Sequence, residues 1–386
     1  MNGHIARVMD LDLPPAQSAF LWGARKTGKS TLLRTLFPDS PVFDFLRTDL
    51  FLEMSSAPHR LREQLEAMNR DFSGCPIILD EVQKVPALLD EVHWMIEKRG
   101  WQFILCGSSA RKLKRGGGNL LGGRAWRFEL FPFVFPELSD FDLLRALNHG
   151  LLPQHYLQSD ATRSLRAYVW DYLKEEVFDE GLTRNIGAFS RFFDAVGFTN
   201  GQMVNYSNIA RDCGVDAKTV REYFIILEDT LLGVHLPPWR PRPDRSLISR
   251  TPKFYLFDVG VAGALMKRRI PEAKGAPFGQ AFEHFILMEL RAYSSYKELD
   301  FRISYWRTKS GKEVDFILGD GEVAIEVKGG RVDGPDLHTM RSFSKKYRPA
   351  RAIIVSNEKE PRRHGSLDIL PWRHFLTALW AGDIIA

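Results

Sequence analysis

Eight residues near the start of the chain have the types and spacing needed to hold the phosphates of a nucleotide. Gly23 and Gly28 frame a loop that ends in Lys29 and Ser30. In such a loop the backbone N–H groups surround the phosphates, the lysine reaches the β- and γ-phosphates, and the serine hydroxyl can ligate Mg²⁺. The pattern predicts ATP and Mg²⁺ as cofactors, with these ATP-binding residues: Gly23, Ala24, Arg25, Lys26, Thr27, Gly28, Lys29, Ser30 and Thr31.

Two adjacent acids follow a short apolar run, Ile77–Leu79, further along the chain. The run is too short for a helix and is typical of a buried strand, so Asp80 and Glu81 would stand at the end of that strand. Beside a phosphate-binding loop, Asp80 is expected to hold Mg²⁺ together with Ser30, and Glu81 is expected to polarise the attacking water. The alternative is an exposed acidic strand end without a catalytic role.

Two serines follow a second apolar run, Trp101–Cys106, and the glycine after it. A hydroxyl at the end of such a strand can contact the γ-phosphate or the attacking water, and Ser108 is our candidate for that role. Ser108 or Ser109 can equally well be the N-cap of a following helix. The sequence leaves these two roles open.

The elements around these residues predict an α/β fold. The loop lies between a strand at Ala19–Trp22 and an amphipathic helix from Thr31, which is the order that a phosphate-binding loop requires. Residue spacing predicts further elements in this part, with strands at 42–46, 77–81 and 125–130 and helices at 49–69 and 86–99.

The middle of the chain contains two helical segments separated by a tight turn. Gly214 marks the turn, and Asp216 fits the N-cap of the second helix. Together with the strand-like run Leu231–Leu236, this segment resembles a winged helix-turn-helix. Lys218 and Arg221 would face outward and contact DNA, although modules of this kind also bind proteins.

Three arginines separated by prolines follow this segment at positions 240, 242 and 245. Prolines keep a chain extended, so that Arg240, Arg242 and Arg245 could bind successive phosphates of a nucleic acid. A solvated linker without a partner is the alternative.

Four residues nearer the C-terminus form a second group with catalytic potential. A helix from Gly279 is expected to carry Glu283, and two strands of a hairpin carry Asp315, Glu326 and Lys328. This set resembles the site of PD-(D/E)xK nucleases, with Val314 in place of their proline. The resemblance implies that the carboxylates hold Mg²⁺ or Mn²⁺ and that Lys328 stabilises charge on the phosphate. The sequence is compatible with two roles for this domain, cleavage of DNA and binding of DNA without cleavage.

The composition sets limits on the class of protein. Of 386 residues, 44% are hydrophobic and 26% are charged, which is typical of globular proteins. No apolar run reaches the length of a membrane span, and the N-terminus lacks the apolar segment of a signal peptide. We expect a cytoplasmic protein without a membrane partner. The net charge of +5 permits an anionic partner but does not require one.

The motifs together resemble the AAA-type (AAA+) ATPases of a bacterial and archaeal family in which a C-terminal domain of unknown function follows the ATPase domain. The resemblance rests on Gly23–Ser30, Leu79–Glu81, Cys106–Ser109, Gly123-Arg124 and Pro132-Phe133. It implies a homo-oligomeric ring, such as a hexamer, in which Arg124 completes the ATP site of the neighbouring subunit. Arg111 is the alternative for this arginine, and a structural surface role is another.

We therefore predict an AAA+ P-loop ATPase domain at 1–138, a helical connector with a winged helix at 139–250, and an α/β PD-(D/E)xK-like domain at 251–386. The favoured function is a Mg²⁺-dependent ATPase that acts as an ATP-driven motor or switch on duplex or branched DNA. One alternative is a signalling or defence ATPase whose C-terminal half binds a protein partner. Another is a nucleotide-gated, metal-dependent nuclease.

Overall fold

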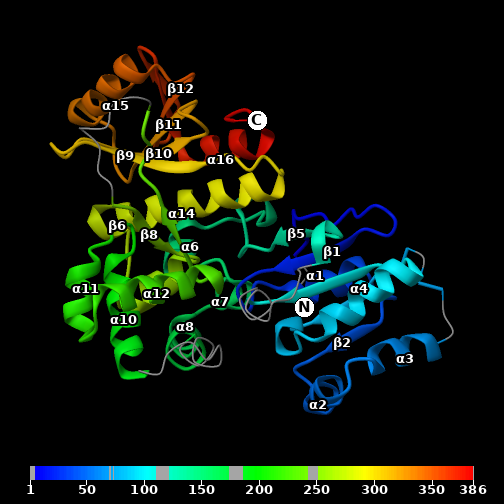
Figure 1. Ribbon diagram of the computed structural model, residues 1–386. Helices are drawn as coiled ribbons and strands as arrows, with labels where there is room; N and C mark the ends of the chain where they lie inside the picture. The colour runs from blue at the N-terminus through cyan, green and yellow to red at the C-terminus, as the bar shows by residue number, and fades with distance from the viewer. Residues whose placement is uncertain are drawn as a thin grey trace. The chain divides into compact units, whose positions relative to one another are not determined.

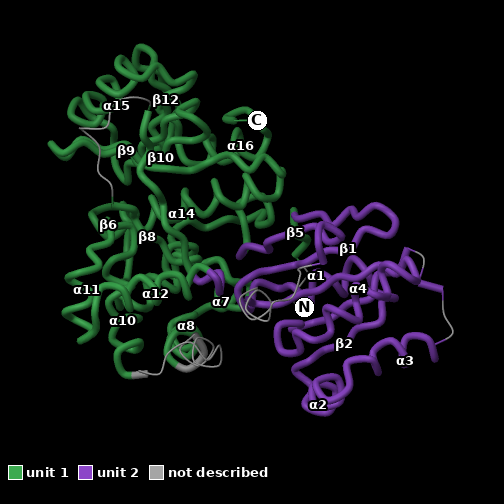
Figure 2. Tube along the Cα trace, viewed as in Figure 1, with its two compact units in different colours: residues 1–8, 133–228, 233–386 green, residues 9–132, 229–232 purple. Residues whose placement is uncertain are grey.

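A computed structural model of the chain describes residues 5–68, 71–72, 74–109, 121–173, 186–241 and 251–385 (Figure 1). The chain divides into two compact units, which are coloured separately in Figure 2. The N-terminal unit comprises residues 9–132 and 229–232, and the C-terminal unit comprises residues 1–8, 133–228 and 233–386. Three arginines considered above, Arg111, Arg242 and Arg245, lie outside the described residues.

The N-terminal unit is built on a parallel sheet with the strand order β2-β3-β4-β1-β5. Three of its strands are buried along their full length, as expected when helices cover a parallel sheet. The loops that follow the carboxyl ends of parallel strands meet at one edge of the sheet, where ligands commonly bind. The strands are β1 (Ser18–Trp22), β2 (Val42–Asp44), β3 (Ile77–Asp80), β4 (Phe103–Gly107) and β5 (Ala125–Glu129).

The helices of this unit largely follow the predicted positions, with one exception. The single helix predicted over 49–69 is wrong, because the structure has two helices that are separated at Ala57 and Pro58. Proline lacks the N–H group that a helix interior needs, and its ring clashes with the preceding turn. The elements are α1 (Lys29–Leu36), α2 (Thr48–Ser56), α3 (Arg60–Ala67) and α4 (Leu88–Arg99), with short 3₁₀ turns η1 (Val82–Lys84) and η2 (Leu121–Gly123).

The first part of the C-terminal unit contains the two predicted helices around Gly214. This glycine has φ 67°, and Asp216 Oδ1 accepts a hydrogen bond from the backbone N–H of Thr219 at 2.7 Å. A small antiparallel sheet with the order β6-β8-β7 follows. The elements are η3 (Phe135–Glu137), α6 (Leu143–His149), α7 (Pro153–Leu157), α8 (Thr162–Ala167), η4 (Tyr168–Leu173), α10 (Ile186–Thr199), β6 (Gln202–Met203), α11 (Tyr206–Cys213), α12 (Ala217–Asp229), β7 (Gly233–Leu236) and β8 (Lys253–Leu256).

The second part of the C-terminal unit is a six-stranded mixed sheet with the order β13-β14-β12-β11-β10-β9. Strands β9, β10 and β11 are antiparallel neighbours, whereas β12 runs parallel to β11. The connection from β11 to β12 is made by α15. The elements are α13 (Val259–Leu265), α14 (Gly275–Tyr296), β9 (Ile303–Arg307), β10 (Glu313–Leu318), β11 (Val323–Lys328), α15 (Gly334–Tyr347), β12 (Arg351–Ser356), β13 (Arg362–His364), β14 (Leu367–Pro371) and α16 (Trp372–Ala381).

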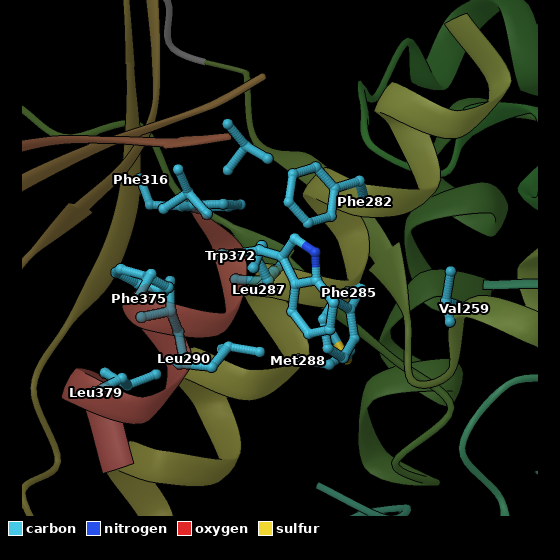
Figure 3. Close-up of a cluster of buried hydrophobic side chains, with 14 of the residues drawn as sticks. Val259, Phe282, Phe285, Leu287, Met288, Leu290, Phe316, Trp372, Phe375 and Leu379 are labelled. Carbon is cyan, nitrogen blue, oxygen red and sulfur yellow. The ribbon is translucent and has the colours of Figure 1, made fainter. Parts of the chain in front are cut away.

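A continuous apolar core holds the long helix α14 in place within the C-terminal unit. Helix α14 packs on β11 and on α16. Figure 3 shows Phe282 and Phe285 of α14 in this cluster, together with Phe316 of the sheet and Trp372 and Phe375 of α16. Such close packing fixes the positions of the polar residues on the same elements. Among the described residues, no helix combines the length and the apolar character that a membrane crossing requires.

Candidate nucleotide site and a second acidic cluster

The glycine-containing loop follows β1 and leads directly into α1. Gly28 is the N-cap residue of α1 and has φ 99°, a left-handed conformation that favours glycine. Lys29 begins the helix with only 6% of its surface exposed. Its Nζ donates to the carbonyl oxygens of Gly23 at 2.7 Å and Ala24 at 3.2 Å. Because both partners are neutral, and no carboxylate among the described residues pairs with Lys29, its charge can act on a phosphate.

The two predicted magnesium ligands lie beside each other at the end of β3. Ser30 Oγ donates to Asp80 Oδ2 at 2.6 Å, and Cys106 Sγ donates to Asp80 Oδ1 at 2.9 Å. Burial, followed by the charge of Asp80, raises the pKa of Cys106 well above its ordinary value, so that the thiol remains a donor. Hydroxyl and carboxylate oxygens are the ligands that Mg²⁺ prefers. Ser30 and Asp80 therefore fit the predicted ion.

The predicted general base is connected to the predicted serine by a third residue. Glu81 is 7% exposed and has φ 58°. Its Oε2 accepts a hydrogen bond from Gln83 Nε2 at 2.5 Å, and the same nitrogen donates to Ser108 Oγ at 3.2 Å. Ser109 is also buried. Gln83 thus holds the Glu81 carboxylate and the Ser108 hydroxyl in fixed positions at the ends of neighbouring strands.

Gln83 is a residue that the sequence interpretation missed. A Cβ at position 107 would lie 2.0 Å from Gln83 Oε1, so the glycine at the end of β4 makes room for the amide group. Gln83 Oε1 is buried without a hydrogen-bond partner among the described residues. The only signals in the sequence were a glutamine two positions after Glu81 and a glycine before Ser108, and neither indicates a contact by its spacing.

The predicted arginine of the neighbouring-subunit site lies just before β5. Arg124 Nε forms an ion pair with Glu97 Oε1, and the hydrogen bond from Arg124 lowers the pKa of Glu97. The side chains are 39% and 46% exposed, and such surface pairs are weak, so Arg124 can change partners. No described contact joins Arg124 to Lys29 or Glu81 of its own chain. Its role in a neighbouring subunit stays a prediction.

These side chains together can bind a nucleoside triphosphate and activate a water molecule. Mg²⁺ at Ser30 and Asp80 would supply a positive charge that polarises the phosphate oxygens. Lys29 would bind the phosphates with its ammonium group. Glu81 would accept a proton from water, while Gln83 keeps the carboxylate oriented.

The residues predicted near the C-terminus lie on neighbouring elements of the C-terminal unit. Asp315 on β10 and Glu326 on β11 are each 8% exposed. Asp315 Oδ2 accepts a hydrogen bond from the backbone N–H of Val327 at 2.8 Å. Lys328 Nζ pairs with Glu326 Oε1 at 2.8 Å and with Asp336 Oδ1 at 3.3 Å. Asp315, Glu326, Glu283 of α14 and Glu313 of β10 are called the acidic cluster below.

A lysine from the small three-stranded sheet enters the acidic cluster. Lys253 on β8 is 5% exposed, and its Nζ lies 3.1 Å from Glu283 Oε1 and 2.5 Å from Glu313 Oε1. Tyr255 of the same strand donates its hydroxyl to Glu283 Oε1 at 2.5 Å. Burial alone would lower the pKa of Lys253, but Tyr255 and the nearby carboxylates raise it well above its ordinary value. Lys253 is therefore a permanent cation, and no sequence motif indicated it.

The carboxyl groups of the acidic cluster influence one another's protonation. Burial, then Glu326 and Glu283, raises the pKa of Asp315 well above its ordinary value. Burial raises the pKa of Glu326 to about 7, although Lys328 opposes this change. In the part of the chain that the structure describes, no group of three or more His, Cys, Asp or Glu side chains is arranged to hold a metal ion. Lysine ammonium groups pair with Glu283, Glu313 and Glu326, and the Mg²⁺ or Mn²⁺ site at this cluster stays a prediction.

The predicted nucleic-acid contacts that the structure describes are all on the surface. Lys218 and Arg221 of α12 are exposed, and so is Arg240 after β7. The guanidinium carbon of Arg221 lies 4.8 Å from the centre of the Tyr206 ring on α11, a cation–π contact. The exposed Glu222 beside Arg221 reduces the positive charge of this face.

Three families match consecutive parts of the chain. Residues 16–139 match a family described as AAA domain. Residues 140–272 match a domain of unknown function (DUF8612), and residues 278–375 match another (DUF4143). No curated protein matches the sequence. Among solved structures, the Aeropyrum pernix ORC1 protein in complex with DNA is similar at 13% identity and a TM-score of 0.26, over 65% of this chain and 86% of that chain.

The AAA match contains every strand of the parallel sheet and the whole of the nucleotide site described above. Its residue range includes the loop at Gly23–Ser30, the acids Asp80 and Glu81, and Ser108. The match confirms the predicted resemblance to AAA-type ATPases, whereas the nuclease-like nature of the C-terminal part stays a prediction. Residues 16–139 of this chain therefore match an AAA domain, and two regions that match domains of unknown function follow it.

Proposed function

We propose that this protein is an ATP-driven motor or switch that acts on duplex or branched DNA. ATP is hydrolysed in the N-terminal unit, and DNA is held by the C-terminal unit. The observation that carries the proposal is the nucleotide site itself, where Ser30 Oγ lies 2.6 Å from Asp80 Oδ2 and Glu81 follows directly. This arrangement supports Mg²⁺-dependent hydrolysis rather than nucleotide storage, because a general base stands beside the metal ligands.

The DNA half of the proposal is supported by two groups of residues. Lys218 and Arg221 are exposed on the helix that follows the tight turn at Gly214. Glu283, Asp315, Glu326 and Lys328, the residues that carry the nuclease resemblance, lie on α14, β10 and β11 of the C-terminal unit. Helix-turn-helix modules and nuclease-like domains both bind nucleic acid through phosphate contacts and groove contacts.

The charge balance of the acidic cluster favours DNA binding over DNA cleavage. Lys253 pairs with Glu283 and Glu313, and Lys328 pairs with Glu326. A divalent cation that binds Glu283, Glu313 or Glu326 would have to displace these ammonium groups. We therefore propose that the nuclease-like region holds DNA without cutting it.

The test compares ATP hydrolysis and DNA binding in the same samples of the full chain. Hydrolysis is measured without DNA and with single-stranded, duplex and four-way DNA, and binding is measured by gel shift across a salt series. Glu81→Gln should keep ATP binding and lose hydrolysis by about 10²–10⁴-fold, because only the general base is removed. Lys218→Gln with Arg221→Gln should weaken DNA binding and flatten its salt dependence.

Three outcomes would overturn parts of the proposal. Full turnover by Glu81→Gln would reject the assignment of the general base. Absence of DNA binding at low salt would reject the DNA function and favour a protein partner. Mn²⁺-dependent cleavage of DNA that is lost in Asp315→Ala would contradict DNA binding without cleavage and would favour a nucleotide-gated nuclease.

We also propose that the chain works as a homo-oligomeric ring in which Arg124 acts on the neighbouring subunit. Mixing Arg124→Ala with Lys29→Ala subunits should restore part of the ATPase activity, since mixed interfaces contain one complete site. A chain that stays monomeric with ATP and hydrolyses it normally would contradict this assembly.

A further inference from the structure

A large cavity with a basic wall lies in the C-terminal unit and shares no residue with the acidic cluster. Its volume is about 830 Å³, and it is bounded by α6, α8 and the segment 267–271 that follows α13. An adjoining cavity of about 470 Å³ shares Lys267 and Arg268 with it. Cavities of about 300–1,000 Å³ are large enough to hold small ligands.

The wall of this cavity carries more positive than negative charge. The carboxylates that line it, Asp142 and Asp160, both accept hydrogen bonds from backbone N–H groups. Asp142 Oδ1 binds the N–H of Arg145 at 3.0 Å, and Asp160 Oδ1 binds the N–H of Thr162 at 2.9 Å. Within the described ranges, neither forms an ion pair with the cations of the wall, which are Arg145, Lys267, Arg268 and Arg269.

One of these cations is held rigidly by neutral groups. Arg145 Nε donates to the carbonyl oxygen of Tyr156 at 2.6 Å, and Nη2 donates to that of Gln158 at 2.6 Å. Its guanidinium carbon lies 5.4 Å from the centre of the Tyr156 ring. The charge is therefore fixed in place without a compensating anion. Because the Arg145 side chain is already ordered, anion binding would cost little of its conformational entropy.

Two further polar atoms of the wall lack partners. Arg268 Nη2 donates to the Val259 carbonyl oxygen at 3.2 Å, but Arg268 Nη1 is buried and has no hydrogen-bond partner in the part of the chain that the structure describes. His149 Nδ1 is in the same situation. Burial lowers the pKa of Arg268 to about 10, so the side chain remains charged at neutral pH. Cations near the end of α13 can favour that helix terminus, but this role would not leave a guanidinium nitrogen buried and unsatisfied.

We propose that this cavity binds a phosphate group, and that the guanidinium group of Arg268 and the exposed side chains of Lys267 and Arg269 contact its oxygens. Guanidinium groups bind phosphate through paired N–H donors, and a half-buried guanidinium with an unused donor is suited to this task. The site is separate from the nucleotide loop of the N-terminal unit and does not depend on ATP hydrolysis. The phosphate may be supplied by a free phosphorylated compound or by a nucleic-acid strand, and the test distinguishes these two sources.

The test uses the full chain with the nucleotide loop weakened by Lys29→Ala. Inorganic pyrophosphate is titrated calorimetrically at low salt into Lys29→Ala alone, into Lys29→Ala with Lys267→Gln and Arg269→Gln, and into Lys29→Ala with Lys297→Gln. Lys267 and Arg269 are exposed, so their substitution should leave the fold intact, and Lys297 is an exposed lysine outside the cavity. We expect the double substitution to weaken pyrophosphate binding at least about tenfold and the control to leave it unchanged.

Competition identifies the source of the phosphate. If short duplex DNA displaces pyrophosphate and the double substitution weakens both, the cavity binds a nucleic-acid backbone. If DNA does not displace it, the cavity binds a free phosphorylated compound. Absence of pyrophosphate binding, or binding that the double substitution leaves unchanged, would overturn the proposal. In the native background, Lys267→Gln with Arg269→Gln should not change basal ATP hydrolysis.

Discussion

Lys29 of the nucleotide loop and Lys253 beside the acidic cluster are both buried lysines, yet their partners differ. Among the described residues, Lys29 Nζ is bound only by the backbone carbonyl oxygens of Gly23 and Ala24. Lys253 Nζ is paired with Glu283 and Glu313. A lysine whose partners are neutral can form an ion pair with a phosphate. A lysine that is paired with buried carboxylates instead balances their charge and stabilises the fold. The comparison separates a ligand-binding lysine from a structural one.

The largest expected effect is on stability at Lys253. Lys253→Met should lower the free energy of unfolding by about 3–5 kcal/mol, because it leaves buried carboxylates without their counter-charge. Urea unfolding measures this change. Lys312→Met, which removes an exposed lysine just before β10, is the matched control and should change stability by less than about 0.5 kcal/mol. A stable Lys253→Met protein would show that Lys253 is not the structural counter-ion.

Lys29→Ala should have the opposite pattern, with a loss of binding and little loss of stability. We expect ATP affinity to fall about 10–100-fold, since a hydrogen bond to a charged group contributes about 1.5–3 kcal/mol. Fluorescent ATP-analogue titration measures the affinity, and urea unfolding of the same samples measures stability. Lys98→Ala on the exposed side of α4 is the control. If Lys29→Ala destabilises the chain as much as Lys253→Met, the two lysines do not differ as proposed.

The acidic cluster should also make stability depend on pH. The pKa of Glu326 is about 7 in the folded chain, above its ordinary value of 4.5, so the folded state binds this proton more tightly. The stabilisation is complete below pH 4.5, where both states are protonated. It is lost as the pH rises from 4.5 to 7, because the unfolded state releases the proton first. The total change is about 1–3 kcal/mol.

Glu326→Gln should flatten this dependence between pH 4.5 and 7, because glutamine does not titrate. Urea unfolding of the native chain and the variant at half-unit pH steps provides the comparison. An unchanged slope in the variant would assign the titration to another group.

The smallest expected effect is at Gln83, and it tests whether this residue orients Glu81 in the nucleotide site. Gln83→Leu should lower kcat about tenfold with little change in KM, because Glu81 loses the hydrogen bond that orients it. Gln64→Leu is a matched control, since Gln64 Nε2 also donates to a glutamate, Glu53, at 3.1 Å but lies outside the nucleotide site. A change in KM alone would place Gln83 in ATP binding instead of catalysis.

Sequence patterns predicted the elements whose chemistry is local. The loop and helix at Gly23–Ser30, the strand that ends in Asp80 and the two helices around Gly214 depend on neighbouring residues, so their patterns sufficed. Pro58 is also a local signal for a break, but the helical spacing continues on both sides of it and predicts one helix.

The contacts of Gln83 and Lys253 could not be predicted, because they depend on how distant segments pack. Lys253 and Glu283 are 30 positions apart, and Gln83 and Ser108 are 25 apart. Nothing in the spacing of these polar residues indicates that they meet. The prediction of a metal site failed to include Lys253 for the same reason, since a counter-ion from another sheet has no motif.

The placement of Lys253 on β8 has a consequence for how the chain folds. Side chains alternate along a strand, so Lys253 and Tyr255 share the face that reaches Glu283, while Phe254 packs against Phe224 with ring centres 4.7 Å apart. A slip of one residue would direct Phe254 toward the carboxylates and place an ammonium group among aromatic rings. The contacts on both faces of this four-residue strand therefore disfavour a register that is shifted by one residue. The native register of β8 is therefore the one that satisfies Lys253 and Phe254 at the same time.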